Sequence, residues 1–326
     1  MEDNMMTLKE IIADIKSDRI KKVIFDADAG NEIDDQYAIA YALSCPNIKV
    51  LSMSGAHFKN EALVPNRYEG MMESYREIIR VLKLLGIDNV PVYKGCTDAL
   101  KVTVPGSFPE VVFEDCEAVD NIIKTADESD EIIYIMVTGT ATNIASAIAK
   151  APRIKDKICV IWLGCSCLDN DGAGDYNYGQ DPAAGKYLLT CGVPLVWLPA
   201  MSPDKSKGTQ CLVEDRPFLE KSFPRRDPAS NYFREELPIE HDPEYYTTDT
   251  NYTGVGKWWH IYWDVAAPAI LHTPEYAEFT IVDVPRINGD DLYVFGEGKT
   301  QAIYVEKYEP APILKNMVDG INSLIK

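Results

Sequence analysis

The chain has 326 residues, 46% of them hydrophobic, and a formal net charge of −19. This length allows a large buried core and fits one large α/β domain. The acidic balance excludes recognition of nucleic acid through its phosphates, which requires a basic surface, and it favours a small-molecule partner. No apolar run reaches the length of a signal peptide or a membrane span, so we expect a cytoplasmic protein with no membrane partner.

Strand-like runs alternate with helical patterns along most of the chain. After a helix at about residues 7–17, the strand-like runs are residues 21–28, 49–55, 90–93, 131–138, 157–164 and 193–198. Helical patterns lie between them, near residues 35–44, 68–85, 115–127, 142–150 and 181–191. This alternation predicts a single doubly wound, mainly parallel open sheet of the α/β class. Functional side chains should then lie in the loops that follow the strands.

Residues 201–259 interrupt this alternation with Pro, Asp, Arg and many aromatic side chains but no sustained period. We interpret them as an insertion or lid near the site, because their aliphatic content is too low for a separate core. A surface-packed meander is the alternative. Regular patterns then return, with a helix near residue 264, strand-like runs at 279–284 and 302–308, and a closing helix after residue 312. Residues 1–326 are therefore expected to form one domain.

The densest group of chemically active side chains lies within residues 22–43, where four carboxylates follow a buried run within ten positions: Asp26, Asp28, Asp34 and Asp35. The last three would crowd the carboxyl end of a strand at the start of a helix. Like charges this close need a counter-charge, and a hard cation with oxygen ligands supplies one, with Asp28 and Asp35 as the expected ligands. Helix capping explains one or two of these aspartates but not all four.

Four further stretches fall at predicted strand ends or helix starts, where they could face Asp28. They are GAHFKNEA at residues 55–62, VTGTATNIASAI at 137–148, DNDGAGDYNYGQDPAAGKYLL at 169–189 and WHIYWDVAAPAIL at 259–271. Each of these stretches is a weak signal by itself, but their order along the chain is informative.

Taken in order, these motifs resemble the nucleoside hydrolases, the family of calcium-dependent N-ribohydrolases. The family's opening DxDxGxDD is similar to Asp26, Asp28, Gly30, Asp34 and Asp35. Its TGxxTN is similar to Thr138, Gly139, Thr142 and Asn143. Its EFNxxxDPxAA is similar to residues 175–184, and its late aspartate at a helix start is similar to Asp264.

The resemblance implies a Rossmann-like fold, a homodimer or homotetramer, and hydrolysis of the N-glycosidic bond of ribonucleosides to free base and ribose. It implies a Ca²⁺ ion held by Asp28, Asp35, the backbone carbonyl of Thr138 and Asp264, with Asp28 as the catalytic base that activates a metal-bound water. A free Asp is too weak a base for this role, but a water at a metal is more acidic than bulk water. The ribose hydroxyls would be hydrogen-bonded by Asp34, Asn60, Asn170, Asp175 and Asn177.

Three positions depart from the family pattern. The loop between Gly30 and Asp34 is two residues longer than usual, so it should bulge under the ribose. Asp175 replaces the usual Glu and is one methylene shorter. Many family members have His at the position of Trp263, whereas the purine-preferring branch has Trp there. We therefore expect Trp263 to stack on a purine base, where the histidine would protonate the leaving base. The alternative for Trp263 is a core residue that packs its own helix.

Aromatic side chains are expected to close the other side of the base. The candidates are Tyr252, Trp258 and Trp259 in the insertion, and Phe108 or Phe113 before it.

Two other functions remain open from the residues alone. FDADAG could be the DxD motif of a haloacid-dehalogenase-type phosphatase, although Asp290 and Asp291 in a Gly-rich turn match its later acid pair poorly. The chain could also be a non-catalytic descendant of the hydrolase fold that binds nucleosides or sugars. The eight cysteines are scattered without a CxxC pair, and Cys165 and Cys167 are interpreted as reduced core or loop residues.

Overall fold

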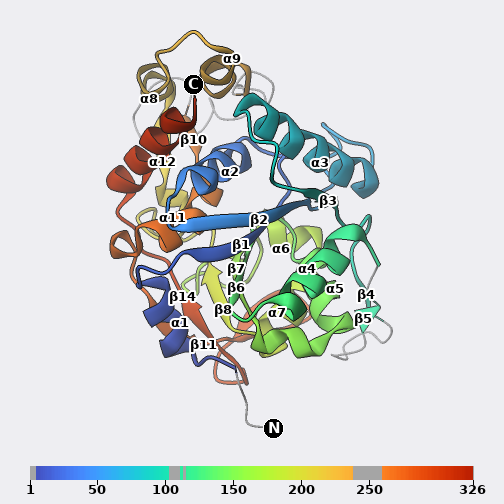
Figure 1. Cartoon of the computed structure of the whole chain (residues 1–326). Coiled ribbons are helices and arrows are strands. Elements are labelled where there is room, and N and C mark those ends of the chain that lie inside the picture. The colour runs from blue at the N-terminus through green and yellow to red at the C-terminus, as the bar shows by residue number, and fades with distance from the viewer. Residues whose placement is uncertain (1–4, 103–110, 113–114, 238–258, 326) are drawn as a thin grey trace.

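The computed structural model describes residues 5–102, 111–112, 115–237 and 259–325, and its centre is an eight-stranded sheet (Figure 1). The strands lie in the order β11 (Thr280–Asp283), β14 (Gln301–Tyr304), β8 (Leu195–Leu198), β7 (Ile158–Leu163), β6 (Ile133–Val137), β1 (Lys21–Ala27), β2 (Ile48–Gly55) and β3 (Val92–Lys94). All neighbouring pairs are parallel except β11 with β14. The predicted mainly parallel α/β sheet is confirmed.

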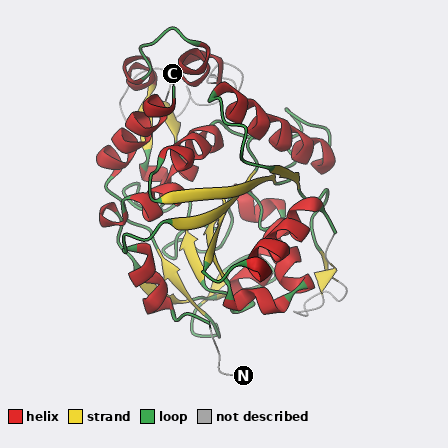
Figure 2. Ribbon diagram, in the orientation of Figure 1, coloured by secondary structure: helices red, strands yellow, loops and turns green. Residues whose placement is uncertain are grey.

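Helices cover both faces of this sheet (Figure 2). The longer ones are α1 (Leu8–Ile15), α2 (Asp34–Ser44), α3 (Arg67–Leu84), α4 (Glu117–Glu128), α5 (Thr142–Lys150), α7 (Pro182–Thr190) and α12 (Pro310–Leu324). The shorter ones are α6 (Tyr176–Gln180), α8 (Arg216–Ser222), α9 (Pro228–Asn231) and α11 (Ala266–His272). Single turns of 3₁₀ helix occur at Pro152–Asp156, Thr209–Cys211, Trp263–Val265 and Pro274–Tyr276, and a π-helical turn occurs at Tyr232–Glu236. None of the helices in these segments has the length and apolar character needed to cross a bilayer.

Side-chain alternation along the strands divides the core into two layers. Phe25 of β1 belongs to the hydrophobic cluster that contains α2, α3, α11 and α12, whereas its neighbour Ile24 belongs to the cluster that contains α4, α5 and α7. Figure 1 shows these two sets of helices on opposite sides of β1 and β2. Because both faces are covered, the strands carry continuous apolar runs instead of alternating polar ones.

The strand order reverses between β1 and β6. From β1 the chain continues outward to β2 and β3 on one side, and from β6 it continues to β7 and β8 on the other. The two strands are in register at Asp26 and Val137, and the Thr138 amide donates to the Asp26 carbonyl at 2.9 Å. In open α/β sheets, the crevice at such a reversal is the usual ligand site. The loops after β1 and β6 are therefore placed for function.

Helix α2 is buried on nearly every side, although its sequence predicts a single apolar face. The Tyr37 side chain is fully buried, and its hydroxyl donates a hydrogen bond to the Phe233 carbonyl. Its ring also meets the ring of Tyr262 edge-on, with centroids 5.1 Å apart. The difference arises because segments more than 190 residues away along the chain cover the face that would otherwise meet water.

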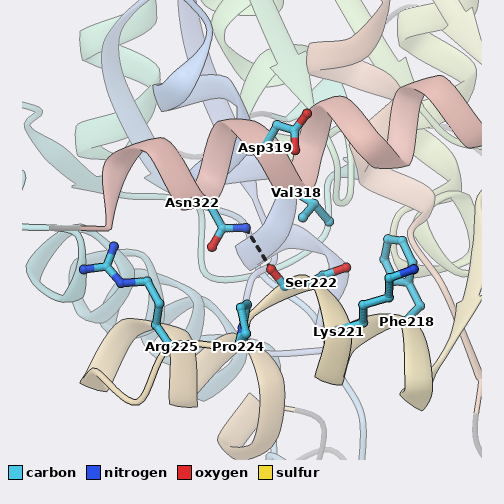
Figure 3. Close-up of a pocket in the computed structure, with 8 residues that line it drawn as sticks. All are labelled: Phe218, Lys221, Ser222, Pro224, Arg225, Val318, Asp319 and Asn322. Carbon is cyan, nitrogen blue, oxygen red and sulfur yellow. Dashed lines mark hydrogen bonds between the residues drawn. The ribbon is translucent and has the colours of Figure 1, made fainter.

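The described part of the 201–259 segment packs on the main core. Its buried residues Phe223, Tyr232 and Phe233 belong to the same hydrophobic cluster as β1 and α2. The Asn322 side chain of α12 donates to the Ser222 carbonyl at the end of α8, at 2.8 Å (Figure 3). A short antiparallel pair also joins β9 (Val213–Asp215) to β10 (Trp259–Ile261).

Two small antiparallel strand pairs were not predicted from the sequence. One joins β4 (Lys101–Val102) to β5 (Val111–Val112), and the other joins β12 (Arg286–Ile287) to β13 (Tyr293–Val294). Strands of two residues are too short to show a period in the sequence.

Candidate active site

Four predicted site carboxylates meet at the carboxyl ends of β1 and β6. Asp28 directly follows β1, Asp34 and Asp35 begin α2, and Asp264 lies in the 3₁₀ turn before α11. All four are at most 4% exposed. The Asp35 carboxylate accepts a hydrogen bond from the Thr138 hydroxyl at 2.7 Å, and Asp34 accepts one from the Asp264 amide at 3.1 Å. Asp35 is also within hydrogen-bonding reach of the Asp28 and Asp264 carboxyls.

Burial raises the pKa values of all four carboxyls in this cluster, and repulsion between carboxylates adds to the effect at Asp28, Asp34 and Asp264. Burial raises the pKa of Asp35 to about 6, and it raises those of Asp28, Asp34 and Asp264 well above the usual range, with neighbouring carboxylates adding to the effect. Asp28 Oδ2 is buried and has no hydrogen-bond partner among the described residues. An all-oxygen donor set with an unused buried carboxylate oxygen fits a hard divalent cation.

The carbonyl of Thr138 is held in place by Asn177. The Asn177 amide donates to the Thr138 carbonyl at 2.7 Å and to the Leu163 carbonyl at 3.0 Å, so it connects the ends of β6 and β7. Both amide protons are therefore used on the backbone, and only Oδ1 remains for a ribose hydroxyl. A carbonyl oxygen has two lone pairs, so Thr138 keeps one for a cation.

Gly139 lies directly against Asp28. A Cβ atom at this position would be 2.8 Å from Asp28 Oδ1 and 2.9 Å from Asp28 Cγ, which is closer than side chains tolerate. The Gly139 carbonyl also accepts a hydrogen bond from the Trp162 indole at 3.2 Å. The glycine of the TGxxTN-like motif is therefore required so that the Asp28 carboxyl can occupy its position.

Asp26 is a buried anchor behind the carboxylate cluster. Its Oδ1 accepts hydrogen bonds from the Ser54 hydroxyl and from the Asn143 amide, the latter at 2.8 Å, so one carboxyl joins β1, β2 and α5. Burial raises the pKa of Asp26 to about 6. These contacts explain the first aspartate and the last asparagine of the motifs as structural partners.

The other predicted ribose contacts divide into two kinds. Asp175 Oδ1 caps α6 by accepting a hydrogen bond from the Tyr178 amide at 2.8 Å. Its Oδ2 is buried and has no hydrogen-bond partner among the described residues. Burial raises the pKa of Asp175 to about 7. Asn60 Oδ1 accepts the Ala62 amide at 3.2 Å, and the Asn170 amide donates to the Met201 carbonyl at 2.6 Å. The described contacts of Asn60 and Asn170 are thus to nearby backbone.

Trp263 immediately precedes Asp264 and is only partly buried, with one side against the main hydrophobic cluster. Tyr252, Trp258, Phe108 and Phe113, which were predicted to approach the base, lie outside the described residues, as does the side chain of Trp259. The described insertion residues Phe223 and Phe233 stack on each other beside Tyr37 instead.

Sequence reasoning missed a second group of possible metal ligands. Within the described segments, one ligand atom each from Glu32, Asp34 and His260 lies within 4.8 Å of the other two. Glu32 occupies the loop between Gly30 and Asp34, and the extra length of this loop was the only hint in the sequence that Glu32 could approach the site. His260 lies on β10, more than 200 residues further along the chain, and no local pattern indicates its approach.

His57, the histidine of the 55–62 loop, is not a candidate acid. It is buried, its Nε2 is 2.9 Å from the Thr142 hydroxyl, and burial lowers its pKa to about 3. The imidazole is therefore neutral at physiological pH.

A separate pocket of about 520 Å³ lies between α8 and α12 (Figure 3). It is lined by Phe218, Lys221, Ser222, Pro224, Arg225, Val318, Asp319 and Asn322. None of these residues belongs to the carboxylate cluster, so we do not assign this pocket to the same site.

Comparison with known proteins matches both the motifs and the fold. Residues 23–306 match the model of the inosine-uridine preferring nucleoside hydrolases. The pyrimidine-specific ribonucleoside hydrolase RihA of Citrobacter koseri is 31% identical over 192 residues, which cover 53% of this chain and 58% of that protein. The chain thus spans about three-fifths of the length of the curated relatives it matches.

Two solved structures share the fold. A purine-preferring ribonucleoside hydrolase from Gardnerella vaginalis superposes with a TM-score of 0.69 at 22% identity, covering 94% of this chain and 99% of that one. A plant nucleoside hydrolase superposes with a TM-score of 0.68 at 16% identity, covering 93% and 99%. The family match extends over most of the chain and includes every motif described above. The chain therefore belongs to the inosine-uridine preferring nucleoside hydrolase family.

Proposed function

We propose that this protein hydrolyses the N-glycosidic bond of ribonucleosides, releasing the free base and ribose, and that it requires Ca²⁺. The observation that carries the proposal is the buried cluster of Asp28, Asp35 and Asp264 around the end of β6, at the reversal of strand order. Buried carboxylates are costly unless a cation or a proton offsets their charge, and such costs are concentrated at functional sites.

Asp28, Asp35, Asp264 and the Thr138 carbonyl would hold the calcium ion, since all are hard oxygen donors. Nucleoside hydrolases depend on a metal ion. When bound, the ion would supply positive charge next to the carboxylates, the attacking water and the ribose hydroxyls. The group formed by Glu32, Asp34 and His260 is the alternative donor set. Its imidazole would favour a transition metal over calcium, so metal selectivity distinguishes the two sets.

Asp28 is the proposed general base. Its buried Oδ2 has no hydrogen-bond partner among the described residues, so it can accept a proton from a water that attacks the anomeric carbon. Burial and the neighbouring carboxylates raise the pKa of Asp28, which favours its protonated form when no counter-charge is present, and a base must be ionised to act. Cation binding and base strength are therefore linked at this residue.

Asp34, Asp175 and Asn177 would hold the ribose. The buried Oδ2 of Asp175 and the remaining Oδ1 of Asn177 are acceptors for ribose hydroxyls. Asn60 and Asn170 complete the expected set. Fixing the sugar in this way places the anomeric carbon against the water and lowers the entropic part of the barrier.

We further propose a preference for purine nucleosides through stacking on Trp263. His57 is neutral and Trp263 replaces the usual histidine, so the leaving base would be stabilised by stacking, worth about 1–3 kcal/mol per base. A matched curated relative is named pyrimidine-specific and a matched solved structure purine-preferring, so base preference requires direct measurement.

The base preference is tested by measuring kcat/KM for inosine and uridine in wild type, Trp263→Phe and Trp263→Ala. Stacking predicts that Trp263→Ala loses more activity on inosine than on uridine, and that Trp263→Phe restores part of the difference. Circular dichroism of each variant monitors folding. An equal loss on both substrates would rule out stacking on the base.

The activity is tested by assaying chelator-stripped protein on a panel of ribonucleosides with Ca²⁺, Zn²⁺ or no metal. We expect activity with Ca²⁺ only, and a kcat for Asp28→Asn that is lower by about 10²-fold to 10⁴-fold. Asp130→Asn, an exposed aspartate before β6, is the matched control and should keep full activity. Phosphatase activity without nucleoside cleavage would support the haloacid-dehalogenase alternative. Binding without turnover would support a non-catalytic descendant.

Two further expectations come from the sequence: the lid from the composition of residues 201–259, and the oligomer from the family resemblance. We propose that residues 201–259 act as a lid over the bound nucleoside, and that the chain forms a homodimer or homotetramer. Sedimentation velocity measures the oligomeric state, and limited proteolysis with and without nucleoside measures whether the segment becomes protected.

A further inference from the structure

Two cysteines that are 20 positions apart in the sequence meet beside the predicted site. Cys96 follows β3, Cys116 is the residue that precedes α4, and their sulfur atoms are 3.4 Å apart. A disulfide requires about 2.05 Å between sulfurs, so closure needs a movement of little more than 1 Å. Side-chain rotation combined with a small backbone adjustment can supply this movement.

The two thiols differ in their access to solvent. Cys96 is fully buried, with its sulfur also 3.8 Å from the Ser146 hydroxyl, whereas Cys116 is only partly buried. A small oxidant can therefore reach Cys116 first, and Cys96 is positioned next to it as the resolving thiol.

The pair is connected to the carboxylate cluster through Asn143. The Cys96 amide donates to Asn143 Oδ1 at 2.7 Å, and the Cys116 sulfur is 3.9 Å from the same oxygen. Asn143 in turn donates to Asp26 at 2.8 Å. A disulfide would use only the sulfurs, so the backbone hydrogen bond from Cys96 to Asn143 can persist in both redox states.

We propose that Cys96 and Cys116 are a reversible thiol-oxidation site that forms an intramolecular disulfide with a hydroperoxide as oxidant. The Cys116 thiol reduces the peroxide O–O bond, giving a sulfenic acid and one molecule of water or alcohol. The Cys96 thiol then attacks the sulfenic sulfur, the S–S bond forms, and a water molecule leaves. A dithiol reductant reverses the reaction by thiol–disulfide exchange.

The cross-link closes a loop of about 20 residues, so it should stabilise the fold by restricting the unfolded chain. For a protein of this size, the expected increase in Tm is on the order of 5 °C. This expectation does not depend on the proposed nucleoside hydrolysis.

The test uses the full chain, reduced with dithiothreitol, desalted and exposed to a small molar excess of hydrogen peroxide. We expect the thiol count of the wild type to fall from eight to six and to return to eight with dithiothreitol. Mass spectrometry of a non-reduced digest should contain a peptide pair linked through Cys96 and Cys116. This mapping uses the wild type, so it does not depend on the folding of any variant.

Variants identify the residues responsible. Cys116→Ser should lose no thiol pair and show no increase in Tm after peroxide treatment. Cys191→Ser is the matched control, because Cys191 is also partly buried but its sulfur contacts the Leu188 carbonyl, and it should still form the disulfide. The proposal is overturned if the wild type keeps all its thiols, if the linked peptides contain another pair, or if Cys116→Ser loses two thiols as the wild type does.

Discussion

Removing the charge of Asp26 should change how the stability of the protein depends on pH. Asp26 is fully buried, and its Oδ2 has no hydrogen-bond partner among the described residues. Asp26→Asn keeps the Oδ1 acceptor that receives the Ser54 hydroxyl and the Asn143 amide. The substitution therefore removes a buried ionisable group while it keeps the hydrogen bonds to β2 and α5.

The magnitude follows from the pKa of Asp26, which burial raises from 3.8 to about 6. A shift of roughly two pKa units corresponds to about 3 kcal/mol. Because the folded-state pKa is raised, the stabilisation from this group is complete below the unfolded-state pKa and is lost as pH rises through the folded-state pKa. Between about pH 4 and about pH 7, the free energy of unfolding of Asp26→Asn should therefore gain about 3 kcal/mol relative to wild type.

The measurement is urea unfolding followed by circular dichroism across this pH range, with chelator present so that no metal competes with protons. Asp130→Asn, at an exposed position, controls for a general effect of lowering the negative charge and should run parallel to wild type. Parallel curves for wild type and Asp26→Asn would refute the reasoning, because they would mean that the buried Asp26 carboxyl titrates as it does in the unfolded chain.

Three other substitutions test the site and its support. Gly139→Ala should lower kcat by about 10²-fold, because the added Cβ would displace the Asp28 carboxyl. Gly179→Ala is the control, since the space around its Cβ is open, and it should leave kcat unchanged. Steady-state kinetics compare the two variants. Asn177→Ala should weaken Ca²⁺ binding by about 10-fold to 100-fold in calorimetry, since the Thr138 carbonyl loses its positioning donor; unchanged affinity would remove Thr138 from the ligand set. Tyr37→Phe should lower the free energy of unfolding by about 1–2 kcal/mol in urea titration, because the buried Phe233 carbonyl loses its hydrogen bond; an unchanged midpoint would mean that this bond does not help to hold the insertion.

The central sheet was predictable because each of its principal strands is a run of apolar residues between helical periods. The helix boundaries were also close, as for α5, which begins and ends at the predicted residues 142 and 150. The environment of α2 was not predictable, because the rings that pack against it belong to Phe223, Phe233 and Tyr262, and sequence periodicity reports only the local chain. Burial by distant segments does not change the pattern of apolar residues within the helix sequence.

The carboxylate cluster was predictable for a different reason. Parallel strands in one sheet end at the same edge, so motifs after β1 and β6 must be neighbours whatever lies between them. Glu32 follows β1 and obeys this rule, but His260 does not, because β10 belongs to a separate two-stranded pair with β9. The approach of Cys96 to Cys116 was missed in the same way, since both residues lie outside the strands.

The buried carboxylates link the fold of this protein to its proposed metal and its proposed chemistry. Folding brings Asp28, Asp35 and Asp264 into one buried space, and burial raises the pKa values of all three, that of Asp35 to about 6, so without a cation they bind protons more tightly than in the unfolded chain. In the proposed mechanism, a proton on Asp28 would prevent it from acting as a base. The proposed Ca²⁺ ion would neutralise the same negative charge and leave Asp28 ionised, so calcium and protons should compete for these carboxyls. Stabilisation by Ca²⁺ should therefore increase as pH rises from about 5 to about 8, since metal ligands must be deprotonated.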